Sequence, residues 1–278
     1  MAYKRPRKKM KKYNVVSLYF IAVVAMCFFS CSKENETDTQ VIITPTSISM
    51  YYKDTKQLSA TNATSWRTED DFVAKVDMKG LVTAGHVGTT NIIASNNKNS
   101  ATCEITVKPK YNLYDTPILD WGASISKIKS QETHKTASTS TSSMLGCDYS
   151  KNSSNPCLVT YQFENDKLKV VFVYLNLQSY GDASNYLLER YEPIYTEQTD
   201  YTVIFSDANS KEKWKTCVEL QTTTVSGTKL TSIMYFPASE LPSMQTDTRA
   251  GALNHEYVQK LTEKYSPAEF EEKVYMFQ

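Results

Sequence analysis

The three histidines are the first candidates for general-base or metal chemistry in this chain. His255 begins the sequence His-Glu-Tyr-Val-Gln, which ends at Gln259. A zinc-protease helix needs a second histidine four residues after the first, because both imidazoles must face one metal ion. Glutamine occupies that position here, so the segment does not predict a zinc site. His86 falls in a predicted turn and His134 in a polar loop, and we predict no bound metal.

A second candidate is Ser124-Ile125-Ser126-Lys127, which matches S-x-x-K, the acylation motif of penicillin-recognising enzymes. Those enzymes also need S-D-N and K-T-G segments, which this sequence lacks. It also has no G-x-S-x-G elbow, no phosphate loop and no dinucleotide-binding fingerprint. We therefore predict no catalytic residue, no cofactor and no enzymatic activity. A hydrolase with an unrecognised site is the alternative.

Cys31 is the cysteine with the clearest chemical context. Seven Lys and Arg residues within 4–12 precede an apolar run over 15–29, and Ser30-Cys31 follows. This leader, through Phe28-Phe29-Ser30-Cys31, resembles a bacterial lipoprotein signal peptide. The resemblance implies a signal peptide over 1–30, cleavage before Cys31 and a covalent lipid on its thiol. The alternative is an uncleaved membrane anchor, for which a run of roughly 20 apolar residues would be needed. Both place the remainder outside the cytoplasm.

Residues 31–40 are polar and predict a flexible tether. Ser32-Lys33-Glu34-Asn35-Glu36 resembles the short acidic tag that sends some Gram-negative lipoproteins to the outer surface of the outer membrane. The resemblance implies a surface-exposed, lipid-anchored outer-membrane protein, with a periplasm-facing position as the alternative. Without the leader the chain has 24 basic and 30 acidic residues, a net charge of about −6. Such a chain has no electrostatic case for binding nucleic acid.

Four further cysteines lie in the mature chain, and the oxidising compartment would permit disulfides between them. Cys147 and Cys157 flank a polar loop and are the candidate pair, although four cysteines allow three connectivities. Cys103 alternates with apolar residues and is predicted to be a buried thiol. Cys217 alternates with charged residues.

Residues 41–108 show short alternating stretches punctuated by turn residues, which predicts a β-sandwich. The segment resembles the bacterial immunoglobulin-like domain, group 2, in which Trp66 would plug the core and Gly80 would form a tight turn. Members of this family serve as spacers or as modules of surface adhesins. The resemblance is carried by these stretches, in chain order: Thr44-Pro45-Thr46-Ser47-Ile48, Gln57-Leu58-Ser59-Ala60, Val73-Ala74-Lys75-Val76-Asp77, Gly80-Leu81-Val82-Thr83-Ala84, Gly88-Thr89-Thr90-Asn91-Ile92 and Ala101-Thr102-Cys103-Glu104-Ile105-Thr106-Val107.

Residues 109–278 are predicted to form an α+β domain with an antiparallel sheet. A helix over 124–132, a hairpin over 159–174 and a helix from Asp182 to Tyr191 are followed by strands at 201–206, 214–220 and 230–236. A helix followed by about three strands, twice over, suggests a tandem α-β-β-β repeat. This order weakly resembles small outer-membrane assembly lipoproteins and a secreted β-lactamase inhibitor. A further helix is predicted through four apolar positions spaced by four: Leu253, Tyr257, Leu261 and Tyr265.

Together these features predict a mainly β protein, an Ig-like β-sandwich followed by the α+β domain. The function that we predict is a lipid-anchored extracytoplasmic binding protein, with the Ig-like domain as spacer. The C-terminal domain would bind a glycan or a protein partner, because its many tyrosines suit extracellular binding surfaces. Trp121, beside Gly122, is the candidate aromatic for stacking on a ligand. A structural subunit of an envelope or surface assembly is the alternative.

Overall fold

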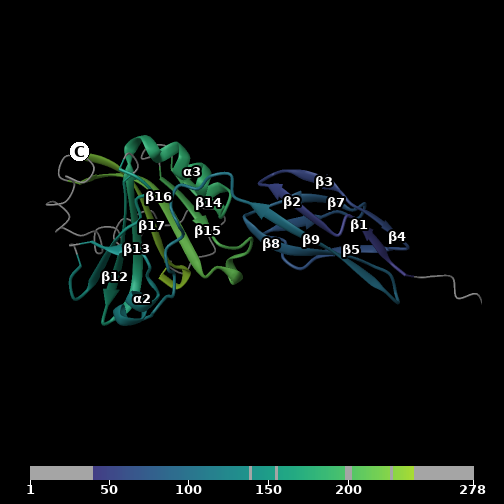
Figure 1. Cartoon of the computed structure of the whole chain (residues 1–278), viewed down its shortest axis with the longest axis horizontal. Helices are drawn as coiled ribbons and strands as arrows, with labels where there is room; N and C mark the ends of the chain where they lie inside the picture. The colour runs from purple at the N-terminus through teal and green to yellow at the C-terminus, as the bar shows by residue number, and fades with distance from the viewer. Residues whose placement is uncertain (1–39, 138–139, 154–155, 198–201, 226–227, 241–278) are drawn as a thin grey trace, which may run out of the picture. The chain divides into compact units, whose positions relative to one another are not determined.

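The computed structural model describes residues 40–240, apart from 138–139, 154–155, 198–201 and 226–227 (Figure 1). The predicted signal peptide, most of the tether, Cys31, and the helix at 253–265 therefore lie outside the described residues. The described part is mainly β, and two separate sheet systems form in chain order. The prediction of an all-β unit followed by an antiparallel α+β unit is confirmed.

The first sheet system covers the segment predicted to be Ig-like. Its main sheets have the orders β2-β9-β8-β5 and β3-β7-β6, and β1 pairs with β4. All described pairs are antiparallel except β2 with β9, which run parallel. The strands are β1 (Ile42–Thr44), β2 (Ser47–Tyr51), β3 (Thr55–Gln57), β4 (Ser59–Thr61), β5 (Ser65–Thr68), β6 (Ala74–Val76), β7 (Leu81–Ala84), β8 (Gly88–Ser95) and β9 (Ser100–Lys108).

The core of this domain is built from residues that alternate along the strands and face inward, as a β-sandwich requires. Cys103 is fully buried in it, as predicted. Trp66 packs on the same cluster at its edge. Its ring would lie 2.7 Å from a Cβ placed on Gly80, whose φ is +80°. Glycine is thus required at position 80 both by the backbone and by the tryptophan beside it.

The second sheet system is one antiparallel sheet of eight strands in the order β10-β11-β12-β13-β17-β16-β15-β14. Its elements are α2 (Ile125–Gln131), β10 (Lys135–Thr136), β11 (Met144–Asp148), β12 (Cys157–Glu164), β13 (Lys167–Asn176), η1 (Leu177–Ser179), α3 (Tyr180–Leu188), β14 (Glu192–Glu197), β15 (Thr202–Ser206), η2 (Lys211–Lys213), β16 (Thr216–Val225), β17 (Thr228–Pro237) and η3 (Ala238–Glu240).

This order is a helix followed by four strands, repeated once. The last strands of the two halves, β13 and β17, pair antiparallel at the centre of the sheet, with Val173 opposite Ile233. The sequence predicted only about three strands in each half. It missed β10, which has only two residues, and β14, which begins at Glu192-Pro193, where the alternation of apolar and polar residues is weak. The predicted hairpin is confirmed, and Asn165 and Asp166 form its turn at positive φ.

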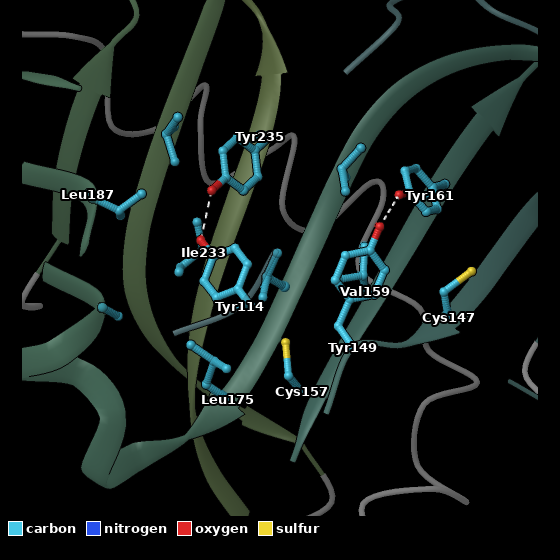
Figure 2. Packing of buried hydrophobic residues seen from close by; sticks show 14 of the residues in the cluster. Tyr114, Cys147, Tyr149, Cys157, Val159, Tyr161, Leu175, Leu187, Ile233 and Tyr235 are labelled. Atoms are coloured by element: carbon cyan, nitrogen blue, oxygen red, sulfur yellow. Dashed lines mark hydrogen bonds between the residues drawn. The ribbon is translucent and has the colours of Figure 1, made fainter. Parts of the chain in front are cut away.

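Both faces of the eight-stranded sheet are buried. One face meets α2 and α3, which contribute Ile128, Tyr186 and Leu187 to its cluster. Tyr114 and Tyr235 lie in the same cluster, and their hydroxyls are 2.7 Å apart (Figure 2). The opposite face has its own cluster, centred on Phe172 and Met234 of the central strands. Long apolar runs in β12 and β13 reflect this burial on both sides.

Hydrogen bonds around Glu189 join the Ig-like domain to the sheet domain. The backbone N–H of Val87 donates to the Glu189 carbonyl at 2.7 Å. The Glu189 carboxylate accepts from the backbone N–H groups of Lys110 and Tyr111, at 2.9 and 3.0 Å. Arg190 contacts the same carboxylate at 2.6 Å. These bonds satisfy a buried carboxylate where the chain passes between the domains.

Candidate functional site

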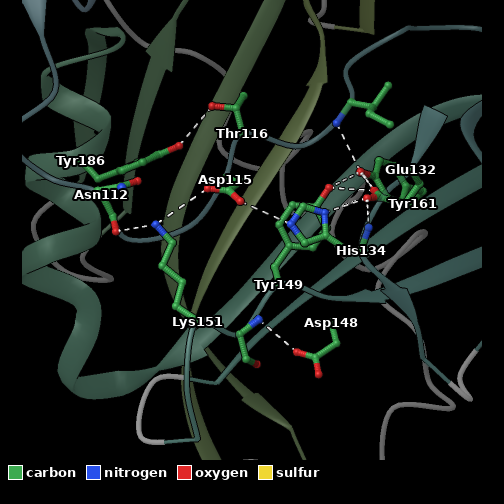
Figure 3. A network of polar contacts seen from close by, with 12 residues as sticks. Asn112, Asp115, Thr116, Glu132, His134, Asp148, Tyr149, Lys151, Tyr161 and Tyr186 are labelled. Carbon is green, nitrogen blue, oxygen red and sulfur yellow. Dashed lines mark hydrogen bonds and ion pairs between the residues drawn. The ribbon is translucent and has the colours of Figure 1, made fainter.

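A network of polar side chains gathers where the linker before α2 meets one end of β11 and β12 (Figure 3). We call Asp115, Glu132, His134, Tyr149, Lys151 and Tyr161 the Glu132 network. Asp115 precedes α2, and Glu132 follows its last turn as the C-cap residue. His134 directly precedes β10, Tyr149 directly follows β11, Lys151 lies in the loop after it, and Tyr161 lies in β12.

The Glu132 carboxylate lies at the centre of this network. Tyr161 and Tyr149 donate their hydroxyls to Oε2 at 2.6 and 2.7 Å. The backbone N–H of His134 donates to Oε1 at 2.9 Å, and Nδ1 of the same residue lies 2.7 Å from it. The two tyrosine hydroxyls are also 2.8 Å apart. The carboxylate side chain is 5% exposed, so it depends on these donors in place of water.

The ionisation of these groups follows from burial and hydrogen bonding. Burial by itself would raise the pKa of Glu132, but the bonds from Tyr161, His134 and Tyr149 outweigh burial and lower it. Burial and the neighbouring carboxylate raise the pKa values of Tyr149 and Tyr161 above their usual range. The stable arrangement at neutral pH is therefore an ionised carboxylate held by two neutral phenols.

The Glu132 carboxylate and Tyr149 hold the imidazole of His134 so that it faces the surface. The ring stacks on Tyr149, with centroids 3.5 Å apart, and its Nδ1 faces Glu132. Its Nε2 lies 3.4 Å from Oδ2 of Asp115, whose side chain is 63% exposed. Nζ of Lys151 lies 3.8 Å from the other Asp115 oxygen and donates to the Asn112 carbonyl. A carboxylate, an imidazole and an ammonium group are thus presented together at one surface.

This geometry is suited to binding polar groups. The Lys151 ammonium is a hydrogen-bond donor, the Asp115 carboxylate is an acceptor, and the His134 imidazole can act as either. These three groups lie within a few ångströms of each other. Among the described residues, no group of three His, Cys, Asp or Glu side chains is arranged to hold a metal ion. The pattern of Glu132 and His134 at the end of a helix is a signal that sequence reasoning did not use. Tyr161 was predicted only as part of the hairpin over 159–174, and Tyr149 was not singled out.

The predicted disulfide between Cys147 and Cys157 is not present. Both residues are free and buried in the cluster under α2 and α3. The strand register explains this, because Cys147 lies opposite Val159, and Cys157 lies opposite Leu175 on the far side of β12. The two cysteines are diagonal neighbours on one face, not a directly opposed pair. Burial raises the pKa of Cys147 to about 12.

The prediction that Trp121 stacks on a ligand is also corrected. Its indole packs against the cluster under the helices and is only partly exposed. Nε1 donates to Oγ1 of Thr216 at 3.0 Å, which ties the linker to β16. Gly122 beside it adopts φ +79° and turns the chain inward. Trp121 is therefore a packing residue at the edge of the core.

The other sequence candidates have structural roles. Ser124 of the S-x-x-K segment is the N-cap of α2 and accepts from the Lys127 backbone N–H at 3.2 Å. Lys127 pairs with Asp120. His86 is buried against Phe72 and lies 3.1 Å from Glu192, and burial lowers its pKa. His255 lies outside the described residues.

Comparison with known proteins supports the reading of the first domain. Residues 38–107 match the model of the family described as bacterial Ig-like domain (group 2), which confirms that resemblance. A comparison with curated proteins gives no match. Among solved structures, domains 5–6 of the S-layer protein SbsC are similar at 11% identity, covering 73% of this chain and 86% of that chain. The TM-score is 0.21, so this likeness carries no functional argument.

Within the described part of the chain, the helices are too short or too polar to traverse a lipid bilayer.

Proposed function

We propose that this chain is a non-catalytic binding protein of the bacterial cell surface, anchored to the outer membrane by lipid on Cys31. The Ig-like domain is the spacer, and the sheet domain contacts a glycan or a protein partner through the Glu132 network. The leader that ends at Cys31 supports the anchor. The family match over 38–107 supports the spacer.

The observation that carries the binding role is the fixed presentation of three polar groups at one surface. Asp115, His134 and Lys151 have side chains that are 63%, 25% and 34% exposed. The buried carboxylate of Glu132 orients the imidazole, so little side-chain freedom is lost when a partner binds. Since both faces of the sheet are buried, no open aromatic sheet surface competes with this site among the described residues.

The test replaces the exposed members of the network. We expect Asp115→Ala combined with Lys151→Ala to weaken partner binding about tenfold or more, because each variant removes a charge-assisted contact. Asp120→Ala combined with Lys127→Ala is the matched control, since it removes an exposed ion pair elsewhere in the linker and α2. Binding is measured on a glycan array and by crosslinking in intact cells. Equal binding by both double variants, or no ligand in either assay, contradicts the proposal.

A structural subunit of a surface assembly is the second candidate. It is favoured by the large exposed hydrophobic side chains, all of which lie in the Ig-like domain among the described residues. These are Ile42, Tyr51, Met78 and Leu81. A stable partner of fixed stoichiometry, crosslinked through this domain and unaffected by Asp115→Ala, would support the second candidate.

The anchor has its own test. We expect an alkyne-tagged fatty acid to label the wild-type protein in cells and to leave Cys31→Ala unlabelled, because the acyl chains are attached to that residue. The Cys31→Ala protein should also leave the membrane fraction. Cys27→Ala, in the apolar run of the leader, should keep both label and location. Label retained on Cys31→Ala would exclude this anchor, and proteolysis of intact cells shows which side is exposed.

A further inference from the structure

The face of the eight-stranded sheet opposite the helices is the feature that the proposed function leaves unexplained. We call it the Glu219 face. Neither α2 nor α3 contributes a residue to its apolar cluster, because both pack on the other side. The residues that border the cluster come from the sheet margins, such as Ala137, Tyr195 and Ala238. Its buried members are Leu158, Val170, Phe172, Tyr174, Ile204, Cys217, Leu230, Met234 and Phe236.

The same face contains polar atoms that require partners. Oγ1 of Thr160, Nε2 of Gln162 and Oε2 of Glu219 are buried and have no hydrogen-bond partner among the described residues. Thr160 and Glu219 lie in one row across the sheet, joined through the opposed residues Phe172 and Met234. An occupant of this face must therefore offer polar groups as well as apolar surface. A hydrocarbon surface alone would leave these atoms unpaired.

The chain after β17 starts at the rim of the Glu219 face. Ala238, in η3, packs against the apolar cluster, and its N–H donates to the Lys215 carbonyl at 2.8 Å. Glu240 is held by an ion pair of 3.0 Å to Lys169 of β13. These contacts fix the point from which the remaining 38 residues leave the sheet domain.

We propose that residues 241–278 of the same chain cover the Glu219 face. Eight strands span roughly 34 Å, and 38 residues reach about 57 Å even as a continuous helix, so the length is sufficient. Leu253, Tyr257, Leu261 and Tyr265 are four residues apart and would share one side of a helix. This side combines aliphatic surface for Phe172 and Met234 with phenol groups for the buried polar atoms.

A covalently attached occupant also has an advantage over a second copy of the chain or a separate partner. Linkage at Glu240 gives the segment an effective concentration in the millimolar range, which a separate molecule at the surface does not reach. The segment needs only modest intrinsic affinity to keep the face covered. We therefore take the chain's own C-terminal segment as the occupant.

The buried thiols provide a direct test in the full chain. Cys217 lies in the Glu219 face, Cys147 and Cys157 lie under the helices, and Cys103 lies in the Ig-like core. We compare Leu261→Asp with the control Gln259→Asp, which adds the same charge on the opposite side of the predicted helix. N-ethylmaleimide labelling under native conditions is mapped by mass spectrometry. Leu261→Asp should raise the labelling rate of Cys217 at least tenfold and leave Cys103 unchanged.

A second measurement decides the matter if Leu261→Asp unfolds the domain and exposes Cys147 and Cys157 as well. Leu253→Cys and Leu261→Cys place a thiol on the proposed contact side, and Gln259→Cys is the control. In the folded protein these two thiols should react with N-ethylmaleimide at least tenfold more slowly than the control thiol. A dimer in size-exclusion chromatography would identify a second copy as the occupant. Equal labelling of the three introduced thiols, or equal Cys217 labelling in the folded Asp variants, overturns the proposal.

Discussion

Replacing Glu219 by glutamine is expected to make the protein progressively more stable than the wild type as the pH rises from about 4.5 to 8. Glu219 is 1% exposed, and burial raises the pKa of its carboxyl from 4.5 to about 8. In this window the folded protein keeps a proton that the unfolded chain releases. The contribution of Glu219 to the free energy of unfolding is therefore fully present below pH 4.5 and falls as the pH rises toward the folded pKa. Glutamine has no proton to lose and removes this dependence.

The wild type loses about 1.36 kcal/mol of unfolding free energy for each pH unit above the unfolded pKa of Glu219, until the folded pKa is reached. Between pH 4.5 and 7 the advantage of Glu219→Gln over the wild type should grow by about 3 kcal/mol. Urea unfolding at several pH values measures it. Glu104→Gln, on an exposed position of β9, is the control and should stay within about 0.5 kcal/mol of the wild type. A pH-independent difference for Glu219→Gln would show that this carboxyl is ionised in the folded protein.

Removing the Glu132 carboxylate is expected to destabilise the protein by about 3 kcal/mol at pH 7. Glu132→Ala leaves the hydroxyls of Tyr149 and Tyr161 and two nitrogens of His134 without their charged acceptor. Hydrogen bonds to a charged group are among the stronger ones, and buried donors left unpaired add to the loss. Tyr149→Phe removes one donor only and should cost about 1 kcal/mol.

The pH response of Glu132 should be opposite to that of Glu219. Hydrogen bonding lowers the pKa of Glu132, so its contribution is present above the unfolded value of 4.5 and is lost as the pH falls through the folded pKa. The difference between wild type and Glu132→Ala should therefore shrink below pH 4.5. Urea unfolding from pH 7 to pH 3 measures this change. A difference that stays constant over this range would show that the charge of Glu132 has no part in holding the tyrosines.

The elements that the sequence predicted well are those with strong local signals. The Ig-like domain has a turn every few residues, and the hairpin of β12 and β13 has alternating strands around Asn165-Asp166. The sheet order was less accessible, because the central pair joins residues about 60 positions apart, such as Val173 and Ile233. A local sequence pattern does not predict which strands pair when they lie this far apart in the chain.

The candidate site could not be predicted for the same reason. The Glu132 network takes side chains from a linker, the end of α2, the loops beside β10 and β11, and β12, and its members meet only after the sheet has formed. The errors have a similar cause. Cys147 and Cys157 flank a loop, but register decides which residues oppose each other. Trp121 lies beside Gly122 in a segment predicted as a loop, but its indole contacts Thr216, which is 95 residues further along the chain.

The central pairing of β13 with β17 has a consequence for biosynthesis. β13 is complete at Asn176, whereas its partner begins only at Thr228. At 5–20 residues per second, the ribosome needs roughly 3–12 s to supply the missing strand. During that time the first half carries a ten-residue, largely apolar edge strand that another nascent chain could join. Chaperone holding of this intermediate, or export before folding, would prevent such swapped or aggregated products.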